Sequence, residues 1–211
     1  MIRLARTSDA GALLAIYAHQ VEVGVATFEI EPPSLGDFEA RIAQTLRGWP
    51  WLVFEEQGVA VGYAYASGHR SRAAYQWTVE VSVYVREDFH KRGVGRALYG
   101  VLFEVLRHQG FAVALAGITL PNAGSVRLHE SMGFEPVGVY KAVGFKFGAW
   151  RDVGWWSLNL GSRAGGSPGL VEVVEMSEVL AIPGPLATPP SPVPLEALAM
   201  TAALKVLLGE S

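Results

Sequence analysis

The sequence contains no cysteine, so it can form no disulfide bond, no thiolate metal site and no cysteinyl acyl-enzyme. It lacks any apolar run of the roughly 18 residues that cross a bilayer, and its first residues lack the apolar core of a signal peptide. The net charge of −3 gives no general attraction to nucleic acid or to an anionic membrane. The five histidines are scattered, so we expect no metal site. These absences predict a cytoplasmic protein that binds neither nucleic acid nor membrane.

The residues after Gly161 have few side chains that could build a core. All tryptophan, phenylalanine and tyrosine residues lie before Gly161, whereas most of the prolines follow it. The part before Gly161 is long enough to bury a hydrophobic core of its own. We therefore predict one compact domain over residues 1–160 and a C-terminal extension over residues 161–211, which begins with a flexible linker.

Hydrophobic periodicity and turn residues predict strands and helices throughout the first domain. Strands are expected at residues 2–6, 51–56, 59–67, 77–85, 112–120, 134–146 and 152–160. Helices are expected after a cap at Thr7 or Ser8, after a cap at Ser34, between Val94 and Gly110, and at residues 122–132. The last two strands are expected to pair through a turn at Gly148, Ala149 and Trp150. This order indicates an α/β protein, with a mixed sheet flanked by helices.

A glycine loop joins the strand that ends at Val85 to the helix that begins near Val94. The loop reads Arg92-Gly93-Val94-Gly95, and glycine lets a ligand approach the backbone closely. The first N–H groups of a helix have no partner within the helix, so they can bind an anion such as the pyrophosphate of coenzyme A. The basic residues nearby are His90, Lys91, Arg92 and Arg96. The alternative is an ordinary strand–helix turn with solvated basic side chains.

Glu80 lies in the middle of the expected strand 77–85, on the face opposite its valines. Acetylation of an amine needs the neutral amine, and a carboxylate can take the proton directly or through water. The alternative is an exposed strand carboxylate with no chemical role. A backbone N–H of Val83 or Val85 would stabilise the oxyanion of an attacked thioester, if the strand separates there from its neighbour.

Asn122 and Ser125 stand at the start of the last expected helix, and His129 follows two turns after Asn122. His129 could relay a proton or donate one to a leaving thiolate, or it could be a structural histidine. Asn122 and Ser125 could cap the helix, and a capping side chain can also contact a cofactor.

Arg70, Arg72 and Tyr75 lie in the connection between two expected strands. Guanidinium groups pair well with carboxylate or phosphinate, so this connection could hold an anionic substrate group. The alternative is a solvated loop.

Several stretches together carry a resemblance to a known family. They are residues 75–80, 82–85, 92–95, 120–122, 125–130, 144–146 and 152–154, with Tyr17, Thr27, Phe28, Glu31 and Pro32 earlier in the chain. In these stretches the chain resembles the GNAT acetyltransferases, and within them the phosphinothricin and methionine sulfoximine acetyltransferases. The resemblance covers about residues 1–160. The chain departs from the family at His90, where Gln or Arg is usual, and from many relatives at His129, where they have Tyr.

The resemblance implies the GNAT fold, with a mixed, mostly antiparallel sheet of about seven strands. It implies direct transfer from acetyl-CoA with Glu80 as the base, and homodimers with active sites near the subunit interface. The backbone of Lys91, Arg92, Gly93, Val94, Gly95 and Arg96 would hold the pyrophosphate. The rest of the cofactor would contact Val83, Tyr84, Val85, Asn122 and Ser125. The substrate pocket would include Phe28, Arg72, Tyr75 and Tyr84.

We therefore predict an N-acetyltransferase that acts on the amine of a small amino-acid-like substrate, of the phosphinothricin or methionine sulfoximine type. One alternative is a module that senses acyl-CoA without turnover, which would not need Glu80. Another is a peptide or protein N-acetyltransferase. A peptide needs an open groove, whereas Arg70 and Arg72 favour a small anionic substrate.

Overall fold

The computed structural model describes residues 1–161, so the predicted extension lies outside the described residues apart from Gly161. The strands are β1 (Ile2–Leu4), β2 (Trp51–Glu56), β3 (Val59–Gly68), β4 (Thr78–Val85), β5 (Val113–Leu120), β6 (Glu135–Lys146) and β7 (Ala149–Asn159). The helices are α1 (Ala10–Glu22), α2 (Leu35–Thr45), α3 (Val94–His108) and α4 (Ala123–Ser131). Short 3-10 turns lie at Thr7–Asp9, Ala73–Tyr75 and Glu87–Phe89.

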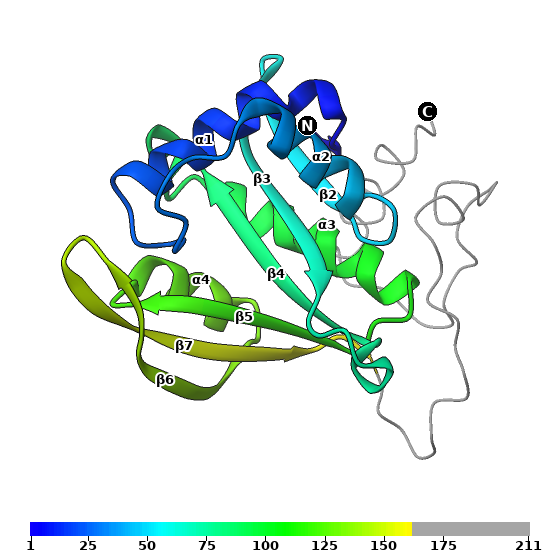
Figure 1. Ribbon diagram of the computed structural model, residues 1–211. Helices are drawn as coiled ribbons and strands as arrows, with labels where there is room; N and C mark the ends of the chain where they lie inside the picture. Colours follow the sequence, from blue (N-terminus) through cyan, green and yellow to red (C-terminus); the bar gives the residue numbers. More distant parts are fainter. Residues whose placement is uncertain (162–211) are drawn as a thin grey trace.

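The strands form one mixed sheet in the order β1-β2-β3-β4-β5-β7-β6 (Figure 1). The β4–β5 pair is parallel and the other five pairs are antiparallel. The predicted fold class is therefore confirmed, including the mostly antiparallel sheet of seven strands.

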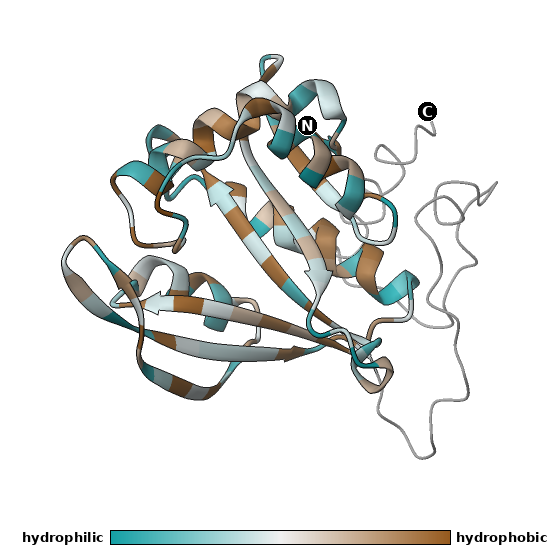
Figure 2. Cartoon of the chain, in the orientation of Figure 1, coloured by the Kyte–Doolittle hydropathy of each residue, from teal (hydrophilic) through white to brown (hydrophobic). Residues whose placement is uncertain are grey.

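Helices cover both faces of the sheet, and each face has its own core. α3 packs on one face through Leu98, Leu102 and Leu106, which are fully buried. α1 and α2 pack on the other face, where Leu13 and Phe38 are buried among aromatic residues of β2 and β3. Figure 2 shows apolar and more polar residues alternating along β4. The β4 valines share one face and Glu80 lies on the other, as predicted, and the valine face packs on α3.

The β4–β5 pairing is short. It runs only from Thr78 opposite Val113 to Glu80 opposite Leu115. Beyond this point β4 continues along β3 as far as Val85, and β5 continues along β7 as far as Leu120. The two parallel strands therefore diverge, and a wedge opens between them (Figure 1). The separation that the oxyanion hypothesis requires is present in the fold.

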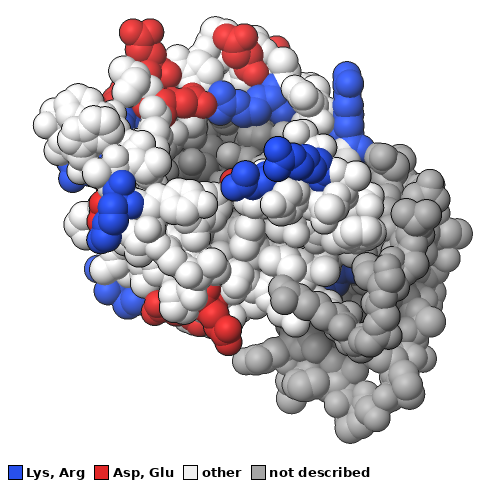
Figure 3. Space-filling model, turned by 60° about the horizontal axis from the view of Figure 1, so that its bottom comes forward, with Lys and Arg blue, Asp and Glu red and all other residues white. Residues whose placement is uncertain are grey.

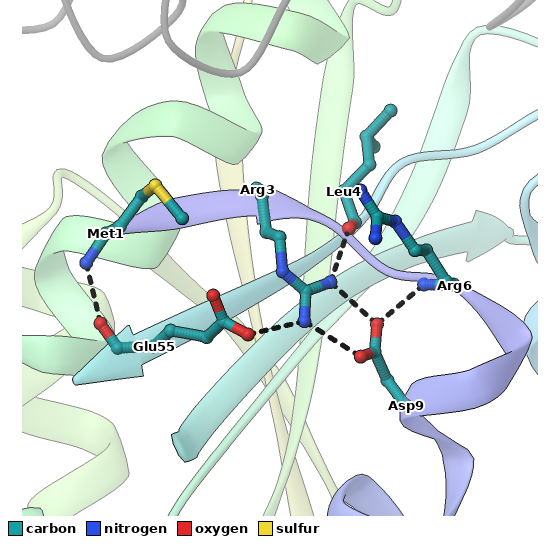
Figure 4. Close-up of polar contacts among 6 residues, drawn as sticks. All are labelled: Met1, Arg3, Leu4, Arg6, Asp9 and Glu55. Carbon is teal, nitrogen blue, oxygen red and sulfur yellow. Dashed lines mark hydrogen bonds and ion pairs between the residues drawn. The ribbon is translucent and has the colours of Figure 1, made fainter. Parts of the chain in front are cut away.

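An ionic network, rather than the predicted helix cap, organises the connection between β1 and α1 (Figure 4). Arg3 donates hydrogen bonds to Asp9 at 2.7 and 2.8 Å and to Glu55 at 2.6 Å. Asp9 also accepts the Arg6 N–H at 2.7 Å, and this closes the turn before α1. The predicted cap at Thr7 or Ser8 was wrong, because Arg3 recruits the Asp9 carboxylate to this turn.

Two other local predictions can be compared with the structure. The Ser34 cap is confirmed, since its Oγ accepts the Asp37 N–H at 3.2 Å. The turn between β6 and β7 was wrongly placed: it consists of Phe147 and Gly148, both left-handed at φ +51° and +72°. Such two-residue turns match the twist of a hairpin. Trp150 therefore lies within β7, paired with Phe145.

Candidate active site

The wedge between β4 and β5 contains a pocket of ≈ 70 Å³. Its lining comes from both diverging strands, from α4 and from Tyr99 of α3. Five of the predicted site residues meet here: Val83, Tyr84, Asn122, Ser125 and His129. Figure 3 shows a hollow in the surface of the molecule, with both basic and acidic side chains on its rim.

The backbone of β4 presents polar groups to this wedge. The Arg86 N–H bonds to Val61 of β3, so the backbone groups of Tyr84 and Ser82 also point toward β3. Those of Val83 and Val85 consequently point away from β3, toward the space that β5 has left. His90 donates from Nε2 to the Val85 carbonyl at 2.9 Å, which agrees with this direction. The Val83 N–H is thus placed to bind an acceptor in the wedge.

The N-terminus of α3 reaches the same region because its first turn contains small residues. Gly93 is left-handed, with φ +81°, and no side chain caps the helix. A Cβ on Gly95 would lie 3.1 Å from Leu128 of α4 and 3.8 Å from Val83 of β4. Glycine therefore lets α3 approach both elements closely. The N–H groups of the first turn of α3 have no partner within the helix, so they can bind an anion.

The predicted basic residues of this loop are placed differently from one another. Arg92 lies over the ring of Phe89 at 4.7 Å. Arg96 donates to the Ser131 carbonyl at the end of α4, at 3.2 Å. Lys91 has a left-handed backbone, with φ +61°. All three side chains are exposed, so both they and the backbone amides of the loop are available to a phosphate.

His129 is buried and both of its ring nitrogens have hydrogen-bond partners. Nδ1 lies 2.8 Å from the Ser125 carbonyl, which can only accept, so Nδ1 carries a proton. Nε2 lies 3.0 Å from the Tyr99 hydroxyl. Burial lowers the pKa of His129, and the bond to Ser125 opposes this only in part. The ring is therefore neutral at pH 7, and Tyr99 donates to Nε2.

Sequence reasoning missed Tyr99. It lies in the buried stripe of α3, where its ring stacks on Phe103 at 5.0 Å. A buried tyrosine hydroxyl usually has a hydrogen-bond partner. A tyrosine within an apolar helical stripe was therefore a signal that a polar group faces the helix, although it did not identify His129.

Glu80 is paired with a second residue that sequence reasoning missed. His69, which follows β3, places Nδ1 2.7 Å from Glu80 Oε1. The His69 side chain is 14% exposed and that of Glu80 is 36% exposed, so the pair is partly sheltered. Ser67 lies opposite Glu80 in the sheet, and His69 follows two residues later. Because side chains alternate along a strand, residues 67 and 69 lie on the same face. That this face meets Glu80 follows only once the pairing register of the two strands is known.

The predicted substrate residues do not form one cluster. Tyr84 lines the wedge, stacked on Tyr63 at 5.3 Å. Arg72 and Tyr75 border a different hollow of ≈ 360 Å³ beyond the end of β3. Phe28 packs on Gly144 of β6, where an added Cβ would lie 2.2 Å from its ring.

The connection between α1 and α2 carries Phe28 and is anchored beside the wedge. Tyr17 and Thr27 share a hydrogen bond between their hydroxyls at 2.8 Å. Lys146 at the end of β6 is buried and donates from Nζ to the Thr27 carbonyl at 2.9 Å. Burial lowers the pKa of Lys146, and Glu29 opposes this shift. Ala26 of the same connection lines the wedge pocket.

Other kinds of site were also sought in the described part of the chain. Residues 1–161 contain no group of three or more His, Asp or Glu side chains that could hold a metal ion. Their helices are too short or too polar to span a membrane. The predicted absence of a metal and the predicted cytoplasmic location remain predictions.

Comparison with known proteins identifies the family. The acetyltransferase (GNAT) domain family matches residues 2–155. The chain belongs to the GNAT acetyltransferases. The resemblance and the enzyme class predicted from the sequence are therefore confirmed.

Two curated relatives indicate the branch of the family. The phosphinothricin N-acetyltransferase of Streptomyces viridochromogenes is 40% identical over 155 residues, covering 74% of this chain and 85% of the relative. The L-methionine sulfoximine/L-methionine sulfone acetyltransferase of Salmonella typhimurium is 39% identical over 167 residues, covering 77% and 96%.

Solved structures agree with this placement. An acetyltransferase from Salmonella typhimurium, determined with its cofactor acetyl-CoA, has a TM-score of 0.76 and 37% identity, covering 80% of this chain and 98% of that one. A phosphinothricin acetyltransferase from Sinorhizobium meliloti in complex with acetyl-CoA also has a TM-score of 0.76, with 34% identity, covering 83% and 97%. The enzyme is thus an N-acetyltransferase similar to the phosphinothricin and methionine sulfoximine acetyltransferases.

Proposed function

We propose that this N-acetyltransferase transfers the acetyl group of acetyl-CoA to the amine of a small amino-acid-like substrate, of the phosphinothricin or methionine sulfoximine type. The observation that carries the proposal is the wedge between β4 and β5. It combines the Val83 N–H, the uncapped N-terminus of α3 and a pocket at one place. The relatives named for these substrates, and the related structures that contain acetyl-CoA, support the choice of acceptor and donor.

The donor would lie along the open edge of β4. The backbone amides from Lys91 to Arg96, in the loop before α3 and its first turn, would bind its pyrophosphate, and Asn122 and Ser125 would contact the pantetheine arm. The free amine attacks the thioester carbonyl, a C–N bond forms, and the C–S bond breaks. The Val83 N–H would stabilise the negative charge that develops on the carbonyl oxygen.

Glu80 would accept the proton that the substrate ammonium must lose. It lies three residues before Val83, which is about 10 Å along a strand at roughly 3.3 Å per residue. The amine attacks a carbonyl held near the Val83 N–H, so its proton would cross this separation to Glu80 either directly or through a water. The departing thiolate must gain a proton. Tyr99 and His129 are hydrogen-bonded to each other in the pocket wall and would supply that proton.

Acetyl-CoA consumption, followed by release of the thiol, tests the proposal. The amine panel would contain methionine sulfoximine, phosphinothricin, common amino acids, a polyamine and a short peptide. Turnover of the first two without turnover of the peptide is expected. Glu80→Gln should lower kcat by about 100-fold or more, with little change in acetyl-CoA binding. Glu56→Gln, an exposed strand carboxylate in β2, is the matched control.

We also propose that the enzyme is a homodimer and that its catalytic domain spans residues 1–160, with 161–211 as a separate extension. β6 is an edge strand, and its apolar side chains Val137, Val139, Tyr140, Val143 and Phe145 are 45–63% exposed. Patches of this kind mark interaction surfaces. Val139→Glu should shift the mass measured by light scattering toward the monomer. Val59→Glu, equally exposed on β3, should not.

A further inference from the structure

The Glu80 carboxylate is held from one side by the imidazole of His69. The two groups are 2.7 Å apart, between Nδ1 and Oε1. Within residues 1–161, the Glu80 carboxylate has no other hydrogen-bond partner, so Oε2 remains available. One oxygen of the carboxylate is therefore fixed and the other is free.

The protonation of His69 follows from its two neighbours. Arg70 Nε lies 3.3 Å from His69 Nε2, and a guanidinium can only donate. Nε2 must therefore accept, and Nδ1 carries the single proton of a neutral ring. That proton points to Glu80, so His69 donates a hydrogen bond to Oε1.

The position of the His69 ring is fixed by packing and by the backbone. The His69 N–H bonds to the Thr78 carbonyl at 3.3 Å, which ties the residue to β4 beyond the end of β3. The Tyr75 ring meets the imidazole edge-on at 5.5 Å, and Trp155 of β7 does so at 6.3 Å. Three separate segments thus set the direction of the Nδ1–H bond.

We propose that His69 is a positioning residue for Glu80. Its Nδ1–H holds Oε1 and directs Oε2 toward the water or amine from which the proton comes. During the reaction the proton moves from the ammonium to Oε2, directly or through that water, and His69 keeps its own proton. This inference rests on the proposed role of Glu80 as the base.

The experiment uses two His69 variants in two backgrounds. His69→Phe keeps an aromatic ring between Tyr75 and Trp155 but loses the donor, whereas His69→Asn keeps an N–H near the position of Nδ1. Each is made in the wild-type chain and in Glu80→Gln. The kcat and both KM values are measured with methionine sulfoximine and acetyl-CoA, together with the melting temperature. His108→Phe, an exposed imidazole at the end of α3, is the matched control.

We expect His69→Phe to lower kcat by about 10- to 100-fold, since a misplacement of about 1 Å has such an effect, with the KM for acetyl-CoA unchanged. His69→Asn should recover most of the loss. In the Glu80→Gln background, His69→Phe should cause little further loss, because the two residues act together.

Four results would overturn the inference, and they can be told apart. An equal loss of kcat from His69→Phe in both backgrounds would show that His69 has only a structural role. Wild-type turnover of His69→Phe, with Glu80→Gln impaired, would show that Glu80 works without His69. Wild-type turnover of Glu80→Gln itself would remove the proposed base, and the role of His69 would fall with it. If His69→Phe does not fold, failure of His69→Asn to exceed a further His69→Ala variant in kcat would count equally against the inference.

Discussion

Gly144→Ala should disturb the predicted substrate residue Phe28 without touching any ionisable group. A Cβ at Gly144 would lie 2.2 to 2.5 Å from three atoms of the Phe28 ring, whereas ordinary contacts begin at 3.4 Å. The ring must therefore withdraw by about 1.2 Å, the difference between 3.4 and 2.2 Å. Because the contacting atoms are the far end of a side chain, the backbone of β6 need not move, and we expect a melting temperature near that of the wild type.

The effect of Gly144→Ala on the reaction should appear in substrate binding. An aromatic contact contributes about 0.5–1.5 kcal/mol, which corresponds to roughly a two- to tenfold rise in the KM of the amine. Steady-state kinetics would measure this rise beside an unchanged KM for acetyl-CoA. Gly138→Ala is the control, since it lies on the same strand and an added Cβ would meet nothing within 4 Å. An unchanged amine KM in Gly144→Ala would remove Phe28 from the substrate pocket.

Other expected outcomes concern polar groups that are partly or fully buried. Arg3→Met should lower the free energy of unfolding by about 1–2 kcal/mol in urea at pH 7. Burial alone would raise the pKa of Asp9, but hydrogen bonds from Arg3 and the Arg6 N–H outweigh it and lower the pKa below 3.8. Arg3 also lowers the pKa of Glu55 from its ordinary 4.5, so its contribution should be complete above pH 4.5 and disappear as the pH falls through the lowered folded pKa values of Glu55 and Asp9; a pH-independent difference would contradict this. Tyr99→Phe leaves His129 Nε2 buried without its donor and should reduce stability by about 1–3 kcal/mol; an unchanged urea midpoint would show that the bond is not formed in solution.

Much of the fold could be predicted because its signals are local. The alternation of valines with Glu80, Ser82 and Tyr84 fixed the two faces of β4 before its neighbours were known. Gly93 and Gly95 marked the approach of a loop to a helix N-terminus. The cap before α1 was less predictable, since Arg3 bonds both Asp9 and Glu55, and Glu55 lies far along the chain.

The pairs at the site could not be predicted because each joins distant residues. Tyr99 and His129 are separated by 30 positions, and no periodicity relates α3 to α4. His69 reaches Glu80 across a strand register that sequence patterns leave open. The divergence of β4 from β5 depends on which residues of the two strands pair, and the sequence does not show this. The separation could therefore be stated only as a condition of the oxyanion hypothesis.

The shortness of the β4–β5 ladder has a consequence for the stability of the whole domain. Three residue pairs join β1–β4 to β5–β7, so the sheet is effectively two smaller sheets connected by a narrow bridge. Acetyl-CoA bound along the open edge of β4 would supply hydrogen bonds that a neighbouring strand normally provides. Acetyl-CoA at 100 times its Kd would then add about 2.7 kcal/mol to the stability of the folded state. The resistance of the enzyme to unfolding would accordingly follow the acetyl-CoA concentration around it.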